Sequence, residues 1–429
     1  MTPVNKNSWL FHWAIRVLFA FANWSKQIQT TDEHGYTDKA ETPPPLAQKK
    51  GSPNSDSANR NWIDFLRHQI RVHPCLSVVA FLWFQSGQCL WAADYPQPEQ
   101  GDYVIHDFRF NSDETLPELR IHYRTLGKPT RDEKGVVRNA VLILHGTTGH
   151  GSNFLRPEFA GELFSKGQLL DATRYYLILP DGIGHGKSSK PSDRLHGHFP
   201  HYGYRDMIEA QYRLITEGLK VNHLRLVMGT SMGGMHTWFW GEIHPDFMDA
   251  LMPLASLPTQ ISGRNRIWRR MVIDDIRTDP EWQDGEYKTQ PHGLRLAAET
   301  LFFMGNNPVQ RQKEAPTLER ADKLLDTYVN NAIKAMDADD VLYALEASRD
   351  YDPGPDLEKI QAPLLAINFA DDLINPPELG ILEHEIKRVK HGRAIVMPAS
   401  GRTRGHGTHT LAAVWKKDFA KFLKKTERR

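Results

Sequence analysis

Cysteine is almost absent from this chain. Only Cys75 and Cys89 occur among 429 residues, and both precede residue 94, in a segment with the features of a removable leader. Without that leader the chain has no thiol, which excludes a cysteine nucleophile, a disulfide framework and a thiolate metal site. We predict a site that contains no metal ion.

Net charge and long apolar runs are also scarce. The formal net charge is +1, so the charge balance gives no reason to expect a nucleic-acid partner. No internal repeat is evident, and no segment is long and apolar enough to indicate a membrane span. With 40% hydrophobic residues, the chain can bury a large core, in one large domain or two smaller ones.

The first 93 residues differ in composition from the rest. Residues 1–61 contain a stretch rich in Pro, Ser, Asn and Lys, and we expect them to be a disordered or mis-annotated extension. Residues 62–93 combine a basic flank, the apolar run Leu76–Phe84 and the small pair Ala92-Ala93, which are the three parts of a secretory signal. A membrane anchor or a buried helix is the alternative. We therefore expect an exported protein, periplasmic or secreted, with a cytoplasmic location as the alternative.

A regular pattern of short β-rich runs begins near residue 100. From the third run onward the residues are almost continuously apolar, which is typical of strands buried on both faces. Helical patterns lie between them, at Tyr204–Leu219 and Met235–His244, and this alternation indicates an α/β fold with a mostly parallel sheet. The eight predicted strands are Tyr103–Phe110, Leu119–Leu126, Ala140–His145, Tyr175–Pro180, Leu224–Gly229, Ala250–Ala255, Pro363–Phe369 and Arg393–Pro398.

A block of helical periodicity separates the sixth strand from the seventh. We interpret residues 260–355 as an inserted helical lid over the ligand-binding edge of the sheet, between two core segments at 94–259 and 356–429. The helices predicted within the block are Arg264–Ile276, Gly293–Phe303 and Leu318–Ala347.

The fifth strand ends in Gly229-Thr230-Ser231-Met232-Gly233, a G-x-S-x-G motif followed by a helical pattern. This arrangement is typical of a nucleophile elbow, a sharp turn that exposes one serine hydroxyl. By chance the motif occurs in roughly one of ten chains of this size. An ordinary glycine-rich turn is therefore the alternative, and the rest of the chain decides between them.

Reactive side chains also follow the last two strands, where ligands bind in such sheets. Asp371 and Asp372 follow the seventh strand. We predict Asp372 as the catalytic acid because Pro376 follows it by four residues. Asp371 remains the alternative, and the unused carboxylate is interpreted as a loop charge or a helix cap.

His406 and His409 follow the eighth strand. We predict His406 as the base, because Gly405 before it lets the loop reach back to Ser231, and His409 is the alternative. The order Ser, Asp, His is the order of α/β-hydrolase triads. A serine hydroxyl needs a base to remove its proton, histidine titrates near neutrality, and an aspartate orients the imidazole.

An oxyanion hole is predicted from the loop after the third strand. One backbone N–H in this loop and the N–H after the nucleophile stabilise the oxyanion in α/β hydrolases. We assign these donors to Thr147 and Met232, and the loss of one such donor costs about 3 kcal/mol. The alternative is a turn whose glycines have only a steric role. His145 is interpreted as a packed neighbour of the site.

Several separate motifs occur in a fixed order between residues 105 and 425. They are His145–Gly149, Phe199-Pro200 with Tyr204–Met207 and Ala210-Gln211, Gly229–Met235, Asp279–Trp282 with Gly285–Tyr287, Gly293-Leu294, Asp337-Ala338 with Leu342-Tyr343, and Asp372–Pro377. Together they resemble the homoserine O-acetyltransferase branch of the α/β hydrolases. In that branch a serine takes an acetyl group from acetyl-CoA and passes it to homoserine, in a deep tunnel under a helical lid. The resemblance implies Ser231 as nucleophile, Asp372 and His406 as its partners, and Thr147 with Met232 as oxyanion donors.

Two departures from that branch favour hydrolysis over transfer. The loop Gly184–Ser188 resembles an ordinary hydrolase loop rather than the loop of the transferases. The lid position that holds a carboxylate-binding arginine in the branch is Ile273 here, with Arg269 and Arg270 a helical turn earlier. A transferase must bind its acceptor well enough to exclude water, and a displaced arginine weakens that binding.

We therefore predict a serine hydrolase that acts on a small or medium carboxylic ester. The alternative is an O-acyltransferase that moves an acetyl group from acetyl-CoA to a hydroxyl acceptor, and a non-catalytic binding protein is a minor alternative. We predict no cofactor, with acetyl-CoA as a co-substrate if the chain is a transferase. The expected partner is a small acyl substrate, and the resemblance implies a homodimer through the lid.

Overall fold

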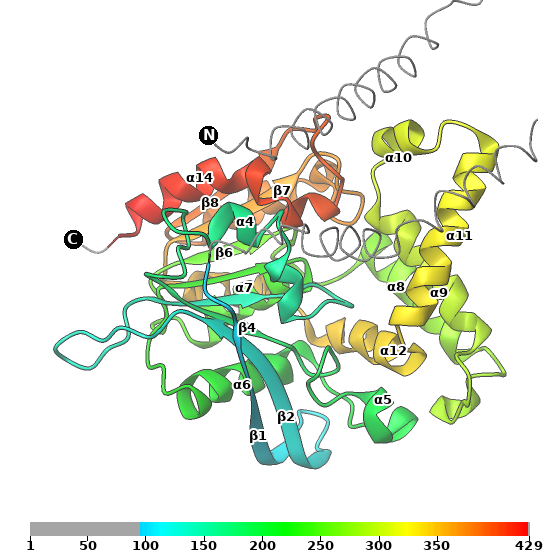
Figure 1. Cartoon of the computed structure of the whole chain (residues 1–429), viewed down its shortest axis with the longest axis horizontal. Coiled ribbons are helices and arrows are strands. Elements are labelled where there is room, and N and C mark those ends of the chain that lie inside the picture. The colour runs from blue at the N-terminus through cyan, green and yellow to red at the C-terminus, as the bar shows by residue number, and fades with distance from the viewer. Residues whose placement is uncertain (1–94, 428–429) are drawn as a thin grey trace, which may run out of the picture. The chain divides into compact units, whose positions relative to one another are not determined.

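The computed structural model describes residues 95–427, in which an eight-stranded sheet forms the centre of the fold (Figure 1). The strand order is β1-β2-β4-β3-β5-β6-β7-β8. Strand β2 is antiparallel to both of its neighbours, and the other pairs are parallel. The predicted α/β fold with a mostly parallel sheet is confirmed. The strands are β1 (Glu99–Arg109), β2 (Thr115–Leu126), β3 (Ala140–Leu144), β4 (Tyr176–Pro180), β5 (Leu226–Thr230), β6 (Leu251–Leu254), β7 (Leu364–Phe369) and β8 (Gly392–Met397).

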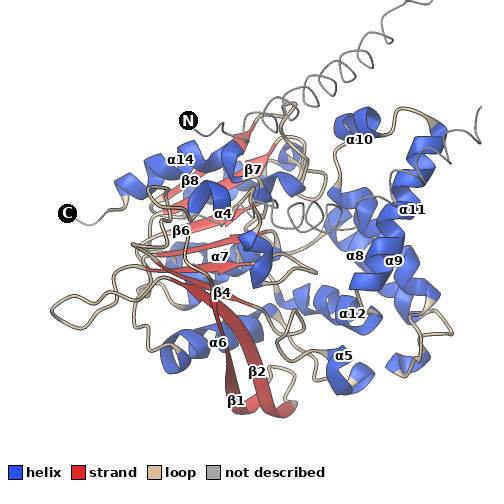
Figure 2. Ribbon diagram, viewed as in Figure 1, coloured by secondary structure: helices blue, strands red, loops and turns tan. Residues whose placement is uncertain are grey.

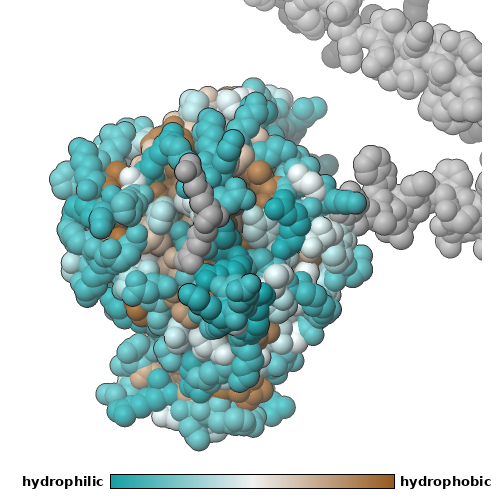
Figure 3. Space-filling view, turned by 90° about the vertical axis from the view of Figure 1, so that its left-hand side faces the viewer, coloured by the Kyte–Doolittle hydropathy of each residue, from teal (hydrophilic) through white to brown (hydrophobic). Residues whose placement is uncertain are grey.

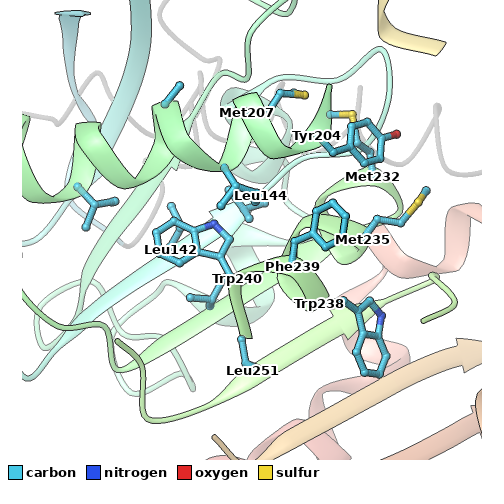
Figure 4. Close-up of a cluster of buried hydrophobic side chains, with 14 of the residues drawn as sticks. Leu142, Leu144, Tyr204, Met207, Met232, Met235, Trp238, Phe239, Trp240 and Leu251 are labelled. Carbon is cyan, nitrogen blue, oxygen red and sulfur yellow. The ribbon is translucent and has the colours of Figure 1, made fainter. Parts of the chain in front are cut away.

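The central strands carry apolar side chains on both faces. In β3 all five residues are buried. Val141 and Ile143 pack into one core cluster, and Leu142 and Leu144 pack into the cluster on the opposite face. Successive side chains of a strand point to opposite faces, so a strand between two helical layers needs apolar residues at every position. Figure 4 shows part of the second cluster, around Trp240.

Helices cover both faces of the sheet (Figure 2). Helices α6 (Tyr204–Arg213) and α7 (Met232–Ile243) pack on one face, and α4 (Ala160–Leu163) and α14 (Ala412–Lys425) pack on the other. Helix α6 was predicted to reach Leu219, but its α-helical part ends at Arg213 and one π turn follows. The short helices α5 (Pro191–Arg194) and α13 (Ile381–Glu385) lie in connections.

Five α-helices lie between β6 and β7, and we call them the helical insertion (right side of Figure 1). They have their own apolar core, which includes Trp268, Val272 and Leu342. The prediction of one helix over Leu318–Ala347 is wrong, because Met336 and Asp337 are extended and the Asp337 side chain caps a new helix. A lid function for the insertion stays a prediction. The helices are α8 (Gly263–Arg277), α9 (His292–Gly305), α10 (Pro308–Glu314), α11 (Leu318–Ala335) and α12 (Ala338–Glu346).

The predicted extension (1–61) and signal segment (62–93) lie outside the described residues. Among residues 95–427, no helix has both the length and the apolar character needed to cross a membrane. The face of the molecule that is turned to the left in Figure 1 is mostly hydrophilic, with separate hydrophobic residues (Figure 3).

Candidate active site

Ser231 lies at the turn between β5 and α7. Its φ of 57° and ψ of −114° are rare for residues other than glycine. Two glycines make this turn possible. A Cβ on Gly229 would lie 2.1 Å from the carbonyl oxygen of Gly233, and a Cβ on Gly233 would lie 1.9 Å from the carbonyl oxygen of Leu144. The G-x-S-x-G spacing therefore has a steric cause, which is a tight turn that presents the serine hydroxyl.

Ser231, His406 and Asp372 are hydrogen-bonded in series. His406 Nε2 lies 2.8 Å from Ser231 Oγ, and His406 Nδ1 lies 2.8 Å from Asp372 Oδ2. Because an ionised carboxylate only accepts hydrogen bonds, it selects the ring tautomer with the proton on Nδ1. Nε2 is then free to accept the hydroxyl proton of Ser231, as base catalysis requires.

The environment of Asp372 keeps this carboxylate ionised. Its Oδ1 accepts hydrogen bonds from the backbone N–H groups of Ile374 (2.8 Å) and Asn375 (3.1 Å). Burial alone would raise the pKa of Asp372, but the positive charge of His406 and the hydrogen bonds outweigh burial and hold the pKa below its ordinary value. The Asn375 side chain also donates to the carbonyl of Ala255 (2.9 Å), which fixes the loop to the end of β6. Our sequence reasoning missed Asn375, although an Asp-x-x-Asn spacing after a strand was an available signal.

The alternative acid and base hold other positions. Asp371 accepts hydrogen bonds from the N–H of Gly405 (3.2 Å) and from the side chain of Asn307, so it fixes the loop that carries His406. The ring centroid of His409 lies 5.2 Å from that of His406. Burial, with the nearby charge of His406, lowers the pKa of His409 to about 3. His409 is therefore a neutral neighbour of the base at pH 7.

The two predicted oxyanion donors adjoin the nucleophile. A Cβ on Gly146 would lie 3.2 Å from the Cβ of Ser231, so the loop after β3 passes close to the serine. Thr147 follows Gly146, and Thr148 has a φ of 60°. Met232 is the first residue of α7, where backbone N–H groups have no partner within the helix. Donation by Thr147 and Met232 to an oxyanion stays a prediction.

Asp181 fixes the loop after β3 relative to β2. Its buried carboxylate pairs with the guanidinium of Arg124 at 2.8 Å and accepts the N–H of Gly151 at 2.7 Å. Burial alone would raise the pKa of Asp181, but hydrogen bonds and positive neighbours lower it below the ordinary value. His145 accepts the N–H of Gly182 at Nε2 (2.9 Å), so it joins the loops after β3 and β4.

Three polar side chains, which we call the Arg269 cluster (Thr147, Tyr204 and Arg269), lie beside the oxyanion loop. Thr147 Oγ1 and the Tyr204 hydroxyl are buried and make no hydrogen bond of ordinary length with the described residues, but Tyr204 lies near enough to interact with both Thr147 and Arg269. Arg269 is 2% exposed and donates to Asn265 (3.0 Å) and Ser348 (3.3 Å). Within residues 95–427 it has no carboxylate partner. A buried guanidinium without a counterion is costly, so this cluster is suited to an anionic group.

Sequence reasoning missed this cluster because Tyr204 belongs to α6 and Arg269 to α8, far apart in the chain. Ile273, at the position of the expected carboxylate-binding arginine, is fully buried in the core of the helical insertion. Arg270 is exposed and pairs with Asp274 at 2.6 Å. Of the two preceding arginines, only Arg269 is buried near the site.

Two cavities lie at the carboxyl edge of the sheet, on opposite sides of β5. A cavity of about 680 Å³ is lined by the loops after β3 and β4 and by α11 and α12. A second cavity of about 520 Å³ is lined by the segments after β6 and β7, with Met235 and Tyr351. Strands β3 and β4 lie on one side of β5, and β6 and β7 lie on the other, so the two cavities flank the strand that leads to Ser231.

The fold and the arrangement around Ser231 match a known class of proteins. A family model for the alpha/beta hydrolase fold matches residues 139–401, and the chain belongs to this family. Within this family, the chain is similar to the homoserine O-acetyltransferases. It is 31% identical over 278 residues to a probable acyltransferase of Methanothermobacter thermautotrophicus, covering 65% of this chain and 84% of the relative. It is 29% identical over 318 residues to a homoserine O-acetyltransferase of Pelobacter propionicus, covering 65% and 83%.

Solved structures of two enzyme classes share this fold. A homoserine O-acetyltransferase from Bacillus anthracis aligns with a TM-score of 0.67 at 21% identity, covering 76% of this chain and 98% of that one. An acetylester hydrolase from Corynebacterium glutamicum aligns with a TM-score of 0.67 at 20% identity, covering 76% and 96%. The chain is thus an enzyme of the α/β-hydrolase family with acyltransferase relatives, and solved esterase structures share its fold.

Proposed function

We propose that this protein is a serine esterase that hydrolyses a small or medium carboxylic ester through an acyl-enzyme at Ser231. The observation that carries this proposal is the pair of 2.8 Å contacts that join Ser231 to His406 and His406 to Asp372. A positioned base within hydrogen-bond reach is what a serine hydroxyl needs in order to attack a carbonyl.

In the first half of the proposed reaction, Ser231 Oγ attacks the carbonyl carbon of the ester and its proton passes to His406 Nε2. The oxyanion accepts the backbone N–H groups of Thr147 and Met232. Asp372 stabilises the imidazolium that forms. The carbon–oxygen bond to the alcohol then breaks, the alcohol takes the proton from Nε2, and the acyl group remains on Ser231.

In the second half, water attacks the acyl-enzyme. His406 removes a proton from the water, the bond between Ser231 Oγ and the acyl carbon breaks, and Oγ recovers its proton. The products are a carboxylic acid and the free serine. Hydrolysis is favoured because Ile273, at the position expected for an acceptor-binding arginine, is buried and apolar. Nothing at that position holds an acceptor in place of water.

The second candidate function is O-acyl transfer to a hydroxyl acceptor that carries a carboxylate, with acetyl-CoA as co-substrate. The specific observation in its favour is Arg269, a buried cation beside Thr147 that has no carboxylate partner in the described part of the chain. An acceptor carboxylate would supply that partner. The names of the acyltransferase relatives agree with this candidate. Neither candidate needs a resident cofactor.

The test compares two activities of the purified full chain, hydrolysis of p-nitrophenyl acetate and acetyl transfer from acetyl-CoA to homoserine. We expect hydrolysis to be the faster. If transfer is faster, the second candidate replaces the first. Ser231→Ala should abolish both activities, and turnover that survives would disprove the nucleophile. Arg269→Leu should remove any transfer while it spares hydrolysis, and the exposed Arg270→Leu is the matched control.

Export and a homodimer through the helical insertion stay proposals. They need separate measurements of cellular location and of mass in solution.

A further inference from the structure

The cavity of about 520 Å³ has a largely apolar surface, and its wall includes residues that are hydrogen-bonded to Ser231 and to Asp372. Leu257, Ile261, Ile374 and Leu379 contribute to its wall. Met235, also in the wall, donates its backbone N–H to the carbonyl of Ser231 at 2.9 Å, one helical turn beyond the nucleophile. Figure 4 shows the Met235 side chain extending away from Phe239.

Wall residues from the segment after β7 connect this cavity to Asp372. Ile374 and Asn375 line it, and both donate their backbone N–H groups to Asp372 Oδ1, at 2.8 Å and 3.1 Å. Tyr351 closes part of the wall through a hydrogen bond of 2.8 Å from its hydroxyl to the carbonyl of Leu257. The wall of the cavity is therefore tied by hydrogen bonds to two of the residues that would carry out the reaction.

We infer that this cavity holds the acyl chain of the substrate, and that this chain is apolar and longer than acetyl. The inference rests on the proposed ester chemistry at Ser231. The cavity lies within the range of about 300–1,000 Å³ that is usual for small-molecule sites, far more space than an acetyl group fills. Most of its wall surface is apolar and offers contact to an alkyl chain, and the wall also contains the charged residues Arg264 and Glu378.

The cavity on the other side of β5 is suited to the leaving group instead. Its wall includes the ion pair between Lys190 and Asp340 (2.7 Å), together with Lys187 and Lys334. Burying an alkyl chain there would remove charged groups from water at a cost. The ester thus spans Ser231, with its acyl chain toward β6 and β7 and its alcohol portion toward β3 and β4.

The expected signature is a rise of kcat/KM with acyl length. Each methylene that is buried in the transition state should raise kcat/KM about fourfold, the equivalent of ~0.8 kcal/mol. The full chain is assayed with p-nitrophenyl acetate, butyrate, hexanoate and octanoate. We expect kcat/KM to rise from acetate to at least hexanoate. A profile that falls steadily from acetate would overturn the inference.

Filling the cavity tests its location. Ile261→Trp should lower kcat/KM for hexanoate at least tenfold more than it lowers kcat/KM for acetate. Ile267→Trp is the matched control, because Ile267 is 61% exposed and lies outside the cavity wall. Leu257→Phe repeats the test at a second wall position, and circular dichroism with the thermal midpoint reports whether each variant is folded. An equal loss with all esters would contradict the inference.

Binding to a chain that cannot react separates this inference from the proposed function. Calorimetry should detect binding of methyl hexanoate to the Ser231→Ala variant. A double variant that also carries Ile261→Trp should not bind it. If methyl hexanoate binds in this way but no ester is hydrolysed by the unchanged chain, the cavity inference holds and the esterase proposal fails. If esters are hydrolysed but methyl hexanoate binds the double variant equally well, only the cavity inference fails.

Discussion

Glu242 lies near the carboxyl end of α7, and its burial leads us to predict an unusual pH dependence of the protein's stability. The residue is 5% exposed, and neither carboxylate oxygen has a hydrogen-bond partner among residues 95–427. Burial, reinforced by the nearby charges of Asp356 and Asp352, raises the pKa of Glu242 from 4.5 to about 8 despite Arg205 and Lys359. The folded protein therefore holds a proton on this side chain at neutral pH.

The sign of the effect follows from where that proton is held. Between pH 4.5 and pH 8 the folded chain keeps the proton of Glu242, whereas the unfolded chain has released it. The contribution of Glu242 to the free energy of unfolding is therefore fully present below pH 4.5 and falls as the pH rises toward 8. At 1.36 kcal/mol per pKa unit, the total loss is ~5 kcal/mol, a large share of the stability of a typical protein.

Glu242→Gln removes the titration but keeps the shape. Urea unfolding of both proteins should give free energies of unfolding that agree within about 1 kcal/mol at pH 5, and the variant should be more stable by about 4 kcal/mol at pH 8. Glu209→Gln, an exposed change on α6, should have no effect at either pH. If Glu242→Gln shifts stability equally at pH 5 and pH 8, the carboxylate is not held protonated and the reasoning is refuted.

Two further predictions concern the candidate site. Asp372→Asn should lower kcat for p-nitrophenyl acetate by about 10⁴, as loss of the correct imidazole tautomer does in serine proteases; Asp371→Asn should lower it far less, and equal losses would leave the acid unassigned. Gly233→Ala should lower the thermal midpoint or prevent folding, because its Cβ would lie 1.9 Å from the carbonyl oxygen of Leu144; Gly401→Ala, with no atom within 4 Å of the added Cβ, is the control, and a Gly233→Ala protein as stable as this control would contradict the steric argument.

Strands were more predictable than helices in this chain. The apolar runs fix β3 to β8 to within about two residues at either end. Strands β3 to β7 are buried along their whole length and are therefore rich in apolar residues, whereas β8, at the edge of the sheet, is only partly buried. Helix ends depend on caps that are easily overlooked. The Asp337 side chain accepts hydrogen bonds from the N–H groups of Asp339 and Asp340, and this cap separates α12 from α11. An Asp at that position is a start signal that helical periodicity alone does not show.

The sequence located the site and favoured Asp372 and His406 within it, but loop conformation decides how these side chains meet Ser231. The strand ends bring Ser231 and the two loops after β7 and β8 together, and this follows from the topology. The choice of Asp372 over Asp371 and of His406 over His409 depends on loop conformation, including the left-handed backbone of Gly405 (φ 59°). The Arg269 cluster could not be predicted from the sequence, because no local pattern links α6 to α8.

Through the ion pair between Arg124 and Asp181, a residue of the antiparallel strand β2 supports a loop of the candidate active site. Strand β2 supplies none of the reacting groups, yet its Arg124 holds the carboxylate that also holds Gly151 in the loop after β3. Under selection for activity, Arg124 should therefore vary as little as the loop it supports. The exposed positions of the neighbouring strand β1, such as His106, should vary more freely.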